Sequence, residues 1–138
     1  MVESKKRTPL SWAAGEGHDE VMKLLLGCQK VNPNLTDEVG RTPLLWAAER
    51  CHFGVVQLLL GCEDVNPNIP DNIGRTPLSR AAEEGHDDVV QLLLAQEGVN
   101  PDIPDYYGKT PLWWASFAPN KRTANLLQAR QAANPDAV

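Results

Sequence analysis

Histidine and cysteine are the residues of this chain whose side chains could bind a metal ion or act as nucleophiles. The histidines, His18, His52 and His86, recur at one constant spacing along the chain. A metal ion needs its nitrogen ligands within about 2.1 Å, whereas successive packed helices lie about 8–10 Å apart. The even spacing therefore predicts a ladder of structural histidines in turns between helices, with no metal-ligating residue.

The cysteines favour neither a disulfide nor catalysis. Cys28 and Cys62 are separated by the same interval as the histidines, and equivalent positions in successive units lie too far apart for a disulfide. Cys51 precedes His52, but sequence neighbours rarely face each other and no oxyanion-hole motif accompanies them. We expect no catalytic and no cofactor-binding residue, with an enzyme that uses Cys51 or a histidine as the remaining alternative.

These spacings reflect a repeat that organises the whole chain. Residues 41–74 and 75–108 are identical at 22 of 34 positions. In each unit a threonine can cap a helix whose first residue is proline, a second helix rich in Val and Leu follows, and a loop with Pro and Gly returns the chain. The Thr-Pro-Leu copies begin at Thr8, Thr42, Thr76 and Thr110. One unit cannot bury its apolar face alone, so we expect an all-α repeat fold, a solenoid of about four helix-turn-helix units joined by hairpin-like loops.

These motifs resemble the ankyrin repeat. Thr-Pro-Leu, Ala-Ala, Gly-His, the Val- and Leu-rich second helix, Val-Asn and Asp-x-x-Gly recur in phase over residues 6–138. The period is 34 rather than the commoner 33, and the style is similar to that of ankyrin arrays of filamentous fungi. The resemblance implies a single ankyrin repeat domain over residues 1–138 that binds a protein partner. Its repeats are expected at approximately 6–40, 41–74, 75–108 and 109–138.

The positions that vary between repeats are the candidates for partner binding. On the first helix of a unit, we expect the face opposite Leu44, Ala47 and Ala48 to be exposed, with Leu45 on it. The resemblance implies that this face lines a concave groove and that the loop tips beside it contact the target. Trp and Tyr are also enriched at binding hot spots. The predicted partner-binding residues are Trp12, Trp46, Arg80, Glu49, Arg50, Glu83, Glu84, Tyr106, Tyr107, Trp113, Trp114 and Phe117.

Each of these interpretations has a structural alternative. Trp12 and Trp46 can instead pack between neighbouring first helices as part of the core. The basic residue before each Thr-Pro-Leu, such as Arg41, can form a salt bridge with a nearby acid such as Glu49 rather than bind a partner. Polar residues, Thr123 and Gln128, replace apolar ones in the last unit, as expected of a terminal repeat, and Pro119 is expected to distort its turn. These residues predict a weak fourth unit.

Composition narrows the class of partner. The chain has 138 residues with a formal net charge of -5, which argues against binding nucleic acid. It has no apolar run near the roughly 20 residues of a membrane span, and its first residues lack the apolar core of a secretory signal. An odd number of cysteines suggests reduced thiols. We therefore expect a monomer in the cytoplasm that binds a protein, or alternatively a designed or excised scaffold with no partner of its own.

Overall fold

The computed structural model of the chain describes residues 7–28, 30–118 and 121–133. Within them eight helices follow one another and no strand is formed. The helices are α1 (Pro9–Glu16), α2 (Asp19–Leu26), α3 (Pro43–Glu49), α4 (Phe53–Leu60), α5 (Pro77–Glu84), α6 (Asp87–Ala95), α7 (Pro111–Ala115) and α8 (Arg122–Ala133). None of them is long and apolar enough to cross a bilayer.

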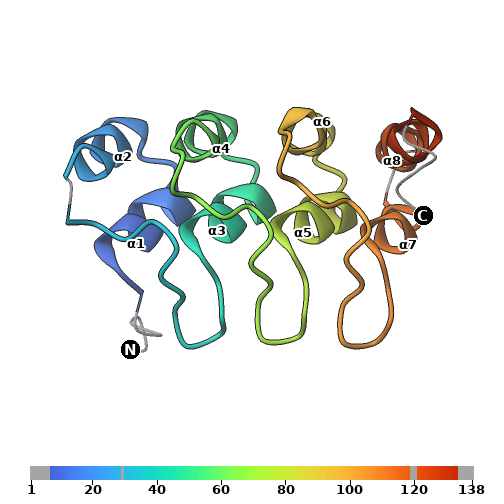
Figure 1. Cartoon of the computed structure of the whole chain (residues 1–138), viewed down its shortest axis with the longest axis horizontal. Helices are drawn as coiled ribbons and strands as arrows, with labels where there is room; N and C mark the ends of the chain where they lie inside the picture. The colour runs from blue at the N-terminus through green and yellow to red at the C-terminus, as the bar shows by residue number, and fades with distance from the viewer. Residues whose placement is uncertain (1–6, 29, 119–120, 134–138) are drawn as a thin grey trace.

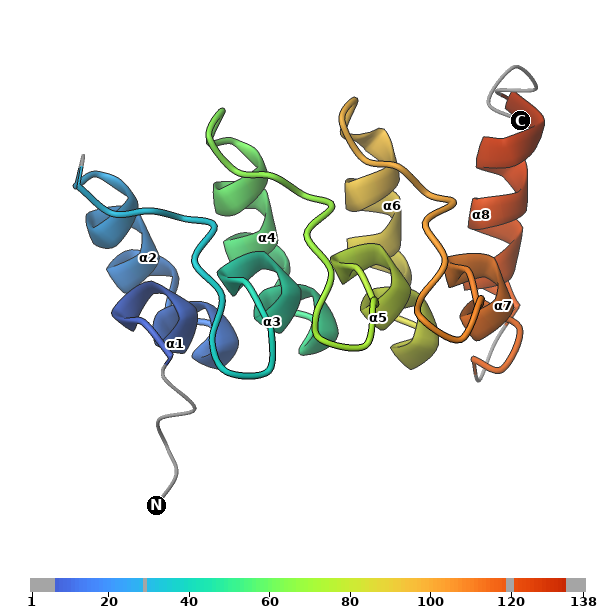
Figure 2. The same ribbon diagram turned by 60° about the horizontal axis from the view of Figure 1, so that its bottom comes forward.

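The helices form two parallel rows, which makes the molecule a solenoid. The inner row consists of α1, α3, α5 and α7, the outer row of α2, α4, α6 and α8, and three long loops project from the inner row on the side away from the outer one (Figure 1). A second view shows the same rows with the loops beside the inner helices (Figure 2). Each inner helix packs against its neighbours in the row and against its own outer helix. The expected all-α solenoid is confirmed.

Every inner helix begins as the sequence predicts. The threonine side-chain oxygen accepts a hydrogen bond from the backbone N–H three residues later, at 3.0 Å for Thr8 and 3.1 Å for Thr42 and Thr76. Proline occupies the first helical position, where its missing N–H leaves no partner unsatisfied. These caps fix the start of each inner helix at the end of its loop.

The buried side of the inner row is wider than the sequence predicts. Leu44, Ala47 and Ala48 are buried as expected, and small alanines allow neighbouring helices to approach closely. Leu45, which the sequence analysis places on the exposed face, is fully buried, as is its equivalent Ser79. The prediction for Leu45 is wrong because an internal inner helix has a neighbour on each side and keeps only a narrow exposed strip.

The fourth unit differs from the others at both helices. Its inner helix α7 has 5 residues, whereas the other inner helices have 7 or 8. Gln128 is exposed, as a terminal repeat requires. Thr123 does not contribute to a polar outer surface, because it is buried and its hydroxyl contacts the Asp87 carboxylate at the start of α6. Pro119 lies outside the described residues.

Prediction: the turn between α3 and α4 holds a strained residue. Gly17 and Gly85 end their inner helices with φ of 75° and 72°, and Cys51 adopts the same left-handed conformation with φ of 62°. A residue with a side chain in this region costs roughly 1–2 kcal/mol. Replacing it with glycine removes this cost, but part of the gain is offset because glycine loses more conformational entropy on folding. We expect Cys51→Gly to raise the free energy of unfolding by about 0.5–1 kcal/mol, measured by urea denaturation. A lower urea midpoint for the variant would contradict this account, and Cys28→Ser serves as the control for loss of a thiol.

Candidate functional site

The three long loops place the candidate surface beside the inner helices (Figure 2). A buried aspartate begins each loop tip: Asp37, Asp71 and Asp105. Their Oδ1 atoms accept hydrogen bonds at 2.9–3.0 Å from the backbone N–H groups two and four residues later. Each carboxylate thus closes a tight turn around its Asp-x-x-Gly segment, which explains why this motif recurs with the period of the repeat.

The second oxygen of each aspartate binds the inner helix nine residues later. Trp46 donates its indole Nε1–H to Asp37 Oδ2 at 2.8 Å, and Trp114 donates to Asp105 Oδ2 at 2.9 Å. In the third unit Arg80 makes the equivalent contact, with Nη2 at 2.6 Å and Nε at 3.1 Å from Asp71 Oδ2. Trp46, Arg80 and Trp114 therefore fasten a loop tip to its helix, which is a structural task.

Burial separates the four tryptophans. Trp46 is 6% exposed, whereas Trp12, at the same position of the first unit, is 47% exposed. The guanidinium carbons of Arg7, Arg41 and Arg50 lie 4.2, 4.5 and 4.8 Å from the centre of the Trp46 ring. Such cation–π contacts stabilise by about 0.5–2 kcal/mol each. The core alternative in the sequence analysis thus describes Trp46, whereas the Trp12 ring is about half exposed and lies 5.0 Å from the guanidinium carbon of Arg7.

The charged groove residues pair mainly with one another. Arg41 binds Glu49 through its two terminal guanidinium nitrogens, Nη1 and Nη2, and Arg75 binds Glu83 at 3.1 Å. Arg80 lies 3.9 Å from Glu49 and 3.5 Å from Glu83. The predicted salt bridge of Arg41 is confirmed.

Charged side chains are also paired between the first and second units. Arg50 contacts Glu16 at 3.3 Å. Glu84 is exposed. Opposite charges in contact cancel each other's field at a distance, so the middle of the groove offers a partner little net charge.

Exposed aromatic side chains gather at the fourth unit. Tyr106 and Tyr107, on the third loop tip, are 72% and 69% exposed, and Phe117 is 68% exposed. The ring centres of Trp113 and Phe117 are 4.7 Å apart, and Lys109 Nζ lies 4.5 Å from the centre of the Trp113 ring. We call Tyr106, Tyr107, Trp113 and Phe117 the aromatic patch. Large exposed apolar groups of this kind mark interaction surfaces.

The loop tips hold Tyr106 firmly in place. Its backbone N–H donates to Ile73 O at 3.0 Å, and Asn72 donates in the same way to Val39 O at 3.1 Å, so adjacent tips are bonded side by side. A Cβ atom on Gly74 would lie 2.6 Å from Tyr106 Cδ1, so only glycine lets the tyrosine ring approach its neighbour this closely. A tyrosine fixed in this way loses little conformational entropy when a partner binds.

Two of the histidines contact the repeat before them. His52 Nε2 lies 3.0 Å from Gly15 O, and His86 Nε2 lies 2.8 Å from Glu49 O, so each links its turn to the preceding repeat. Among the described residues no cluster of His, Cys, Asp and Glu could hold a metal ion. Burial, and then the charge of Asp88, raise the pKa of the Cys51 thiol. A raised pKa lowers the thiolate fraction at neutral pH, which disfavours Cys51 as a nucleophile.

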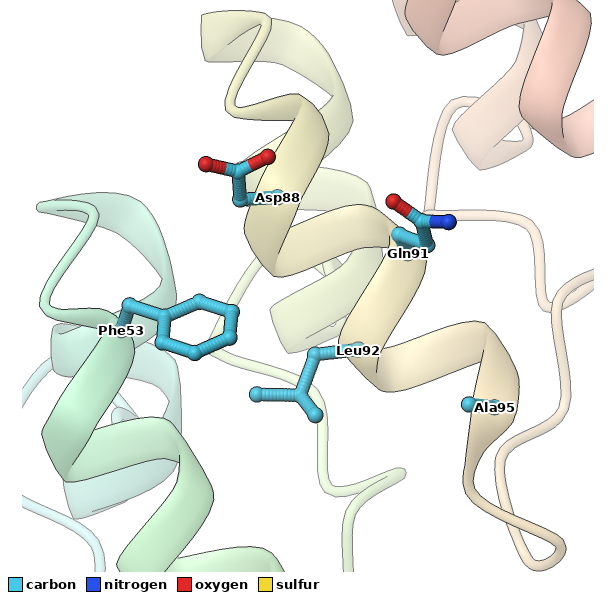
Figure 3. Close-up of a pocket in the computed structure, with 5 residues that line it drawn as sticks. All are labelled: Phe53, Asp88, Gln91, Leu92 and Ala95. Carbon is cyan, nitrogen blue, oxygen red and sulfur yellow. The ribbon is translucent and has the colours of Figure 1, made fainter.

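A pocket of about 350 Å³ lies away from the groove, between the outer helices. Phe53 of α4 faces Leu92 of α6 across it, with Asp88, Gln91 and Ala95 along the α6 side (Figure 3). Among the described residues that line it there is no histidine, cysteine or basic side chain. We assign it no chemistry.

The comparison with known proteins gives a family match. A family model described as ankyrin repeats (3 copies) matches residues 1–71 and 53–137. No curated protein sequence matches the chain significantly.

Prediction: the Trp46 indole nitrogen stabilises the fold. In Trp46→Phe the buried Asp37 carboxylate loses a donor, and an unsatisfied buried acceptor costs about 1–3 kcal/mol. Trp12→Phe is the matched control at the same position of the first unit, where the ring is half exposed and a change within about 0.5 kcal/mol is expected. Urea denaturation followed by circular dichroism measures both. Equal losses in the two variants would show that the hydrogen bond to Asp37 has no special weight.

Prediction: Asp105 makes stability depend on pH. Burial raises the pKa of Asp105, but hydrogen bonds from the Lys109 N–H, the Trp114 indole and the Tyr107 N–H, with the charge of Arg75, outweigh it and lower the pKa overall. The stabilisation is therefore complete above the unfolded pKa of about 3.9 and is lost as pH falls through the lower folded pKa. We expect Asp105→Asn to be less stable at neutral pH and to lose less stability on acidification. Urea midpoints at neutral and acidic pH test this, with exposed Glu84→Gln as control, and an unchanged acid response in Asp105→Asn would contradict it.

Proposed function

The chain belongs to the ankyrin repeat family, and on that premise we propose that it binds one protein partner through its concave groove and loop tips. Ankyrin repeats are generally protein–protein interaction modules and are typically not enzymes. The observation that carries the proposal for this chain is the aromatic patch, where Tyr106, Tyr107 and Phe117 are each more than two-thirds exposed on a firmly held framework. We further propose that the partner is met in the cytoplasm, where the three free cysteines stay reduced.

The contacts in the groove divide the predicted binding residues by role. The aromatic patch and Trp12 provide exposed surface for affinity. Glu84, exposed at the end of α5, provides a charge that a partner can pair with, whereas Arg50 would have to exchange its contact with Glu16 for one with the partner. Trp46, Arg80, Trp114, Glu49 and Glu83 hold the loops and each other, and we propose that they act indirectly by fixing the shape of the groove.

The competing proposal is a scaffold with no partner of its own. The internal pairing of the groove charges supports it, because charges that are already satisfied contribute little to binding. The two proposals differ in what removal of the exposed tyrosines does. A binding module loses its partner, whereas a scaffold is unaffected.

Prediction: the loop-tip tyrosines carry partner binding. We expect Tyr106→Ser/Tyr107→Ser to leave the fold intact and to weaken partner capture from extract of the source cells at least tenfold, or about 1.4 kcal/mol. Phe53→Ser is the matched control, because it removes an exposed ring from the outer helices. Affinity for the captured protein is then measured in purified form for parent and variants. Equal capture by all three proteins would reject the groove and favour the scaffold.

A further inference from the structure

The two ends of the solenoid expose side chains that the internal repeats bury. At the α1 end, Val21 is 44% exposed, although its equivalents Val55, Val89 and Thr123 are fully buried. Pro9 is exposed in the same way, whereas Pro43 is buried. Trp12 joins them on this side, which we call the first-repeat end. A repeat stacked against this end would cover all three residues, just as the first unit covers the equivalent residues of the second unit.

The opposite end is apolar as well. Trp113 is 38% exposed, yet the residues at its position in the other units, Ser11, Leu45 and Ser79, are all buried. Leu112 is also partly exposed, whereas its equivalents are buried. Together with Phe117 these residues form what we call the last-repeat end. Terminal repeats of a solenoid normally present a polar outer face, whereas both ends of this array also leave large apolar side chains uncovered.

The contacts between repeats show how the two ends would meet. Arg7 covers the ring of Trp46, and Arg75 covers that of Trp114, so in both cases the basic residue before Thr-Pro-Leu reaches the inner helix of the next repeat. One repeat further on, the same register places Lys109 of one copy over Trp12 of the next. Trp46 is contacted by Arg7 of the preceding repeat and by Arg41 of its own repeat, whereas among the described residues Trp12, about half exposed, has only Arg7 of its own repeat, at 5.0 Å. To reach Trp12 of a second copy, Lys109 would leave the Trp113 ring that it contacts within its own chain.

An ion pair follows the same register. Within the chain Asp87 lies 4.0 Å from Arg122, across the boundary between the third and fourth units. If the solenoid continued into a second copy, Lys121 of the first molecule would take the place of Asp87, and Glu20 of the second copy would take the place of Arg122. Both residues are exposed. The signs are reversed but the charges stay opposite. Glu20 now contacts Lys23 at 3.1 Å in its own helix, and an exposed pair of this kind exchanges at little cost.

We propose that the last-repeat end of one molecule binds the first-repeat end of a second copy, so that the solenoid continues from one molecule into the next. The occupant is a second copy because the interface it would form continues the one already present between repeats, with matched apolar groups, a cation over Trp12 and an ion pair. The proposed association differs from the monomer that the sequence analysis expects, and the experiment below decides between them. It shares Trp12, Trp113 and Phe117 with the surface proposed for the protein partner, whereas Tyr106 and Tyr107 on the third loop tip belong to the proposed partner surface alone.

The proposed contact is heterologous, so each of its two surfaces can be blocked and tested separately. A head-to-tail contact uses two different surfaces, so blocking one end of a molecule leaves its other end competent. Val21→Glu blocks the first-repeat end, and Trp113→Glu blocks the last-repeat end. Gln57→Glu, on the exposed face of α4, adds the same charge away from both ends and is the matched control. Circular dichroism establishes that each variant is folded.

Sedimentation velocity measures the outcome. We expect the parent and Gln57→Glu to rise above the monomer mass of 15.2 kDa as concentration increases to about 100 μM, where a contact of micromolar Kd is largely formed. Val21→Glu and Trp113→Glu should each stay monomeric alone, with association weakened at least tenfold, and should form a dimer of twice that mass when mixed. A parent that stays monomeric, a blocked variant that still associates alone, or a mixture that stays monomeric would each overturn the proposal. Tyr106→Ser/Tyr107→Ser should associate like the parent, so loss of partner binding and loss of self-association are distinguished.

Discussion

The buried aspartate of each loop is the constraint on which the rest of the structure depends. A carboxylate removed from water must have its oxygens satisfied, and Asp37, Asp71 and Asp105 achieve this with two backbone N–H groups and one side-chain donor each. The backbone bonds fold the loop tip, and the side-chain bond fastens that tip to an inner helix. Because the tips also bond to one another, the groove is a single bonded surface rather than a set of separate loops.

Trp46, Arg80 and Trp114 show how one structural task admits different side chains. A neutral indole and a charged guanidinium both donate to the aspartate, but only the guanidinium brings a charge that also contacts Glu49 and Glu83. The substitution in the third unit therefore alters the electrostatics of the groove without releasing the loop. The charge of Arg80 is balanced by Asp71, Glu49 and Glu83, so the centre of the groove stays nearly neutral.

The fold was predictable from the sequence because its determinants are local and repeated. Thr-Pro caps, alanine pairs and Asp-x-x-Gly turns act within a few residues, and their common phase implies stacking. The role of Trp46 was not predictable in the same way, because its partner Asp37 lies nine residues earlier in a segment whose composition indicates only a turn. Leu45 was misplaced because its burial depends on the next repeat rather than on its own helix. The exposure of Tyr106 and Tyr107 was correctly inferred, since a loop tip has nothing to cover a large ring.

Because the four indoles have different surroundings, intrinsic tryptophan fluorescence can follow the unfolding of separate parts of the molecule. Trp46 lies among three guanidinium groups in a dry site, Trp12 and Trp113 are in contact with water, and residues 75–108 contain no tryptophan. Emission from Trp46 will therefore shift to longer wavelength when the boundary between the first and second repeats opens, because Arg7 and Asp37 of the first repeat contact its ring. Melting of the third repeat removes Arg75 and Asp105 from Trp114, so that indole reports on it although the third repeat has no tryptophan of its own. In a solenoid whose units open in sequence, Trp46 and Trp114 thus report on the opening of two different boundaries between repeats.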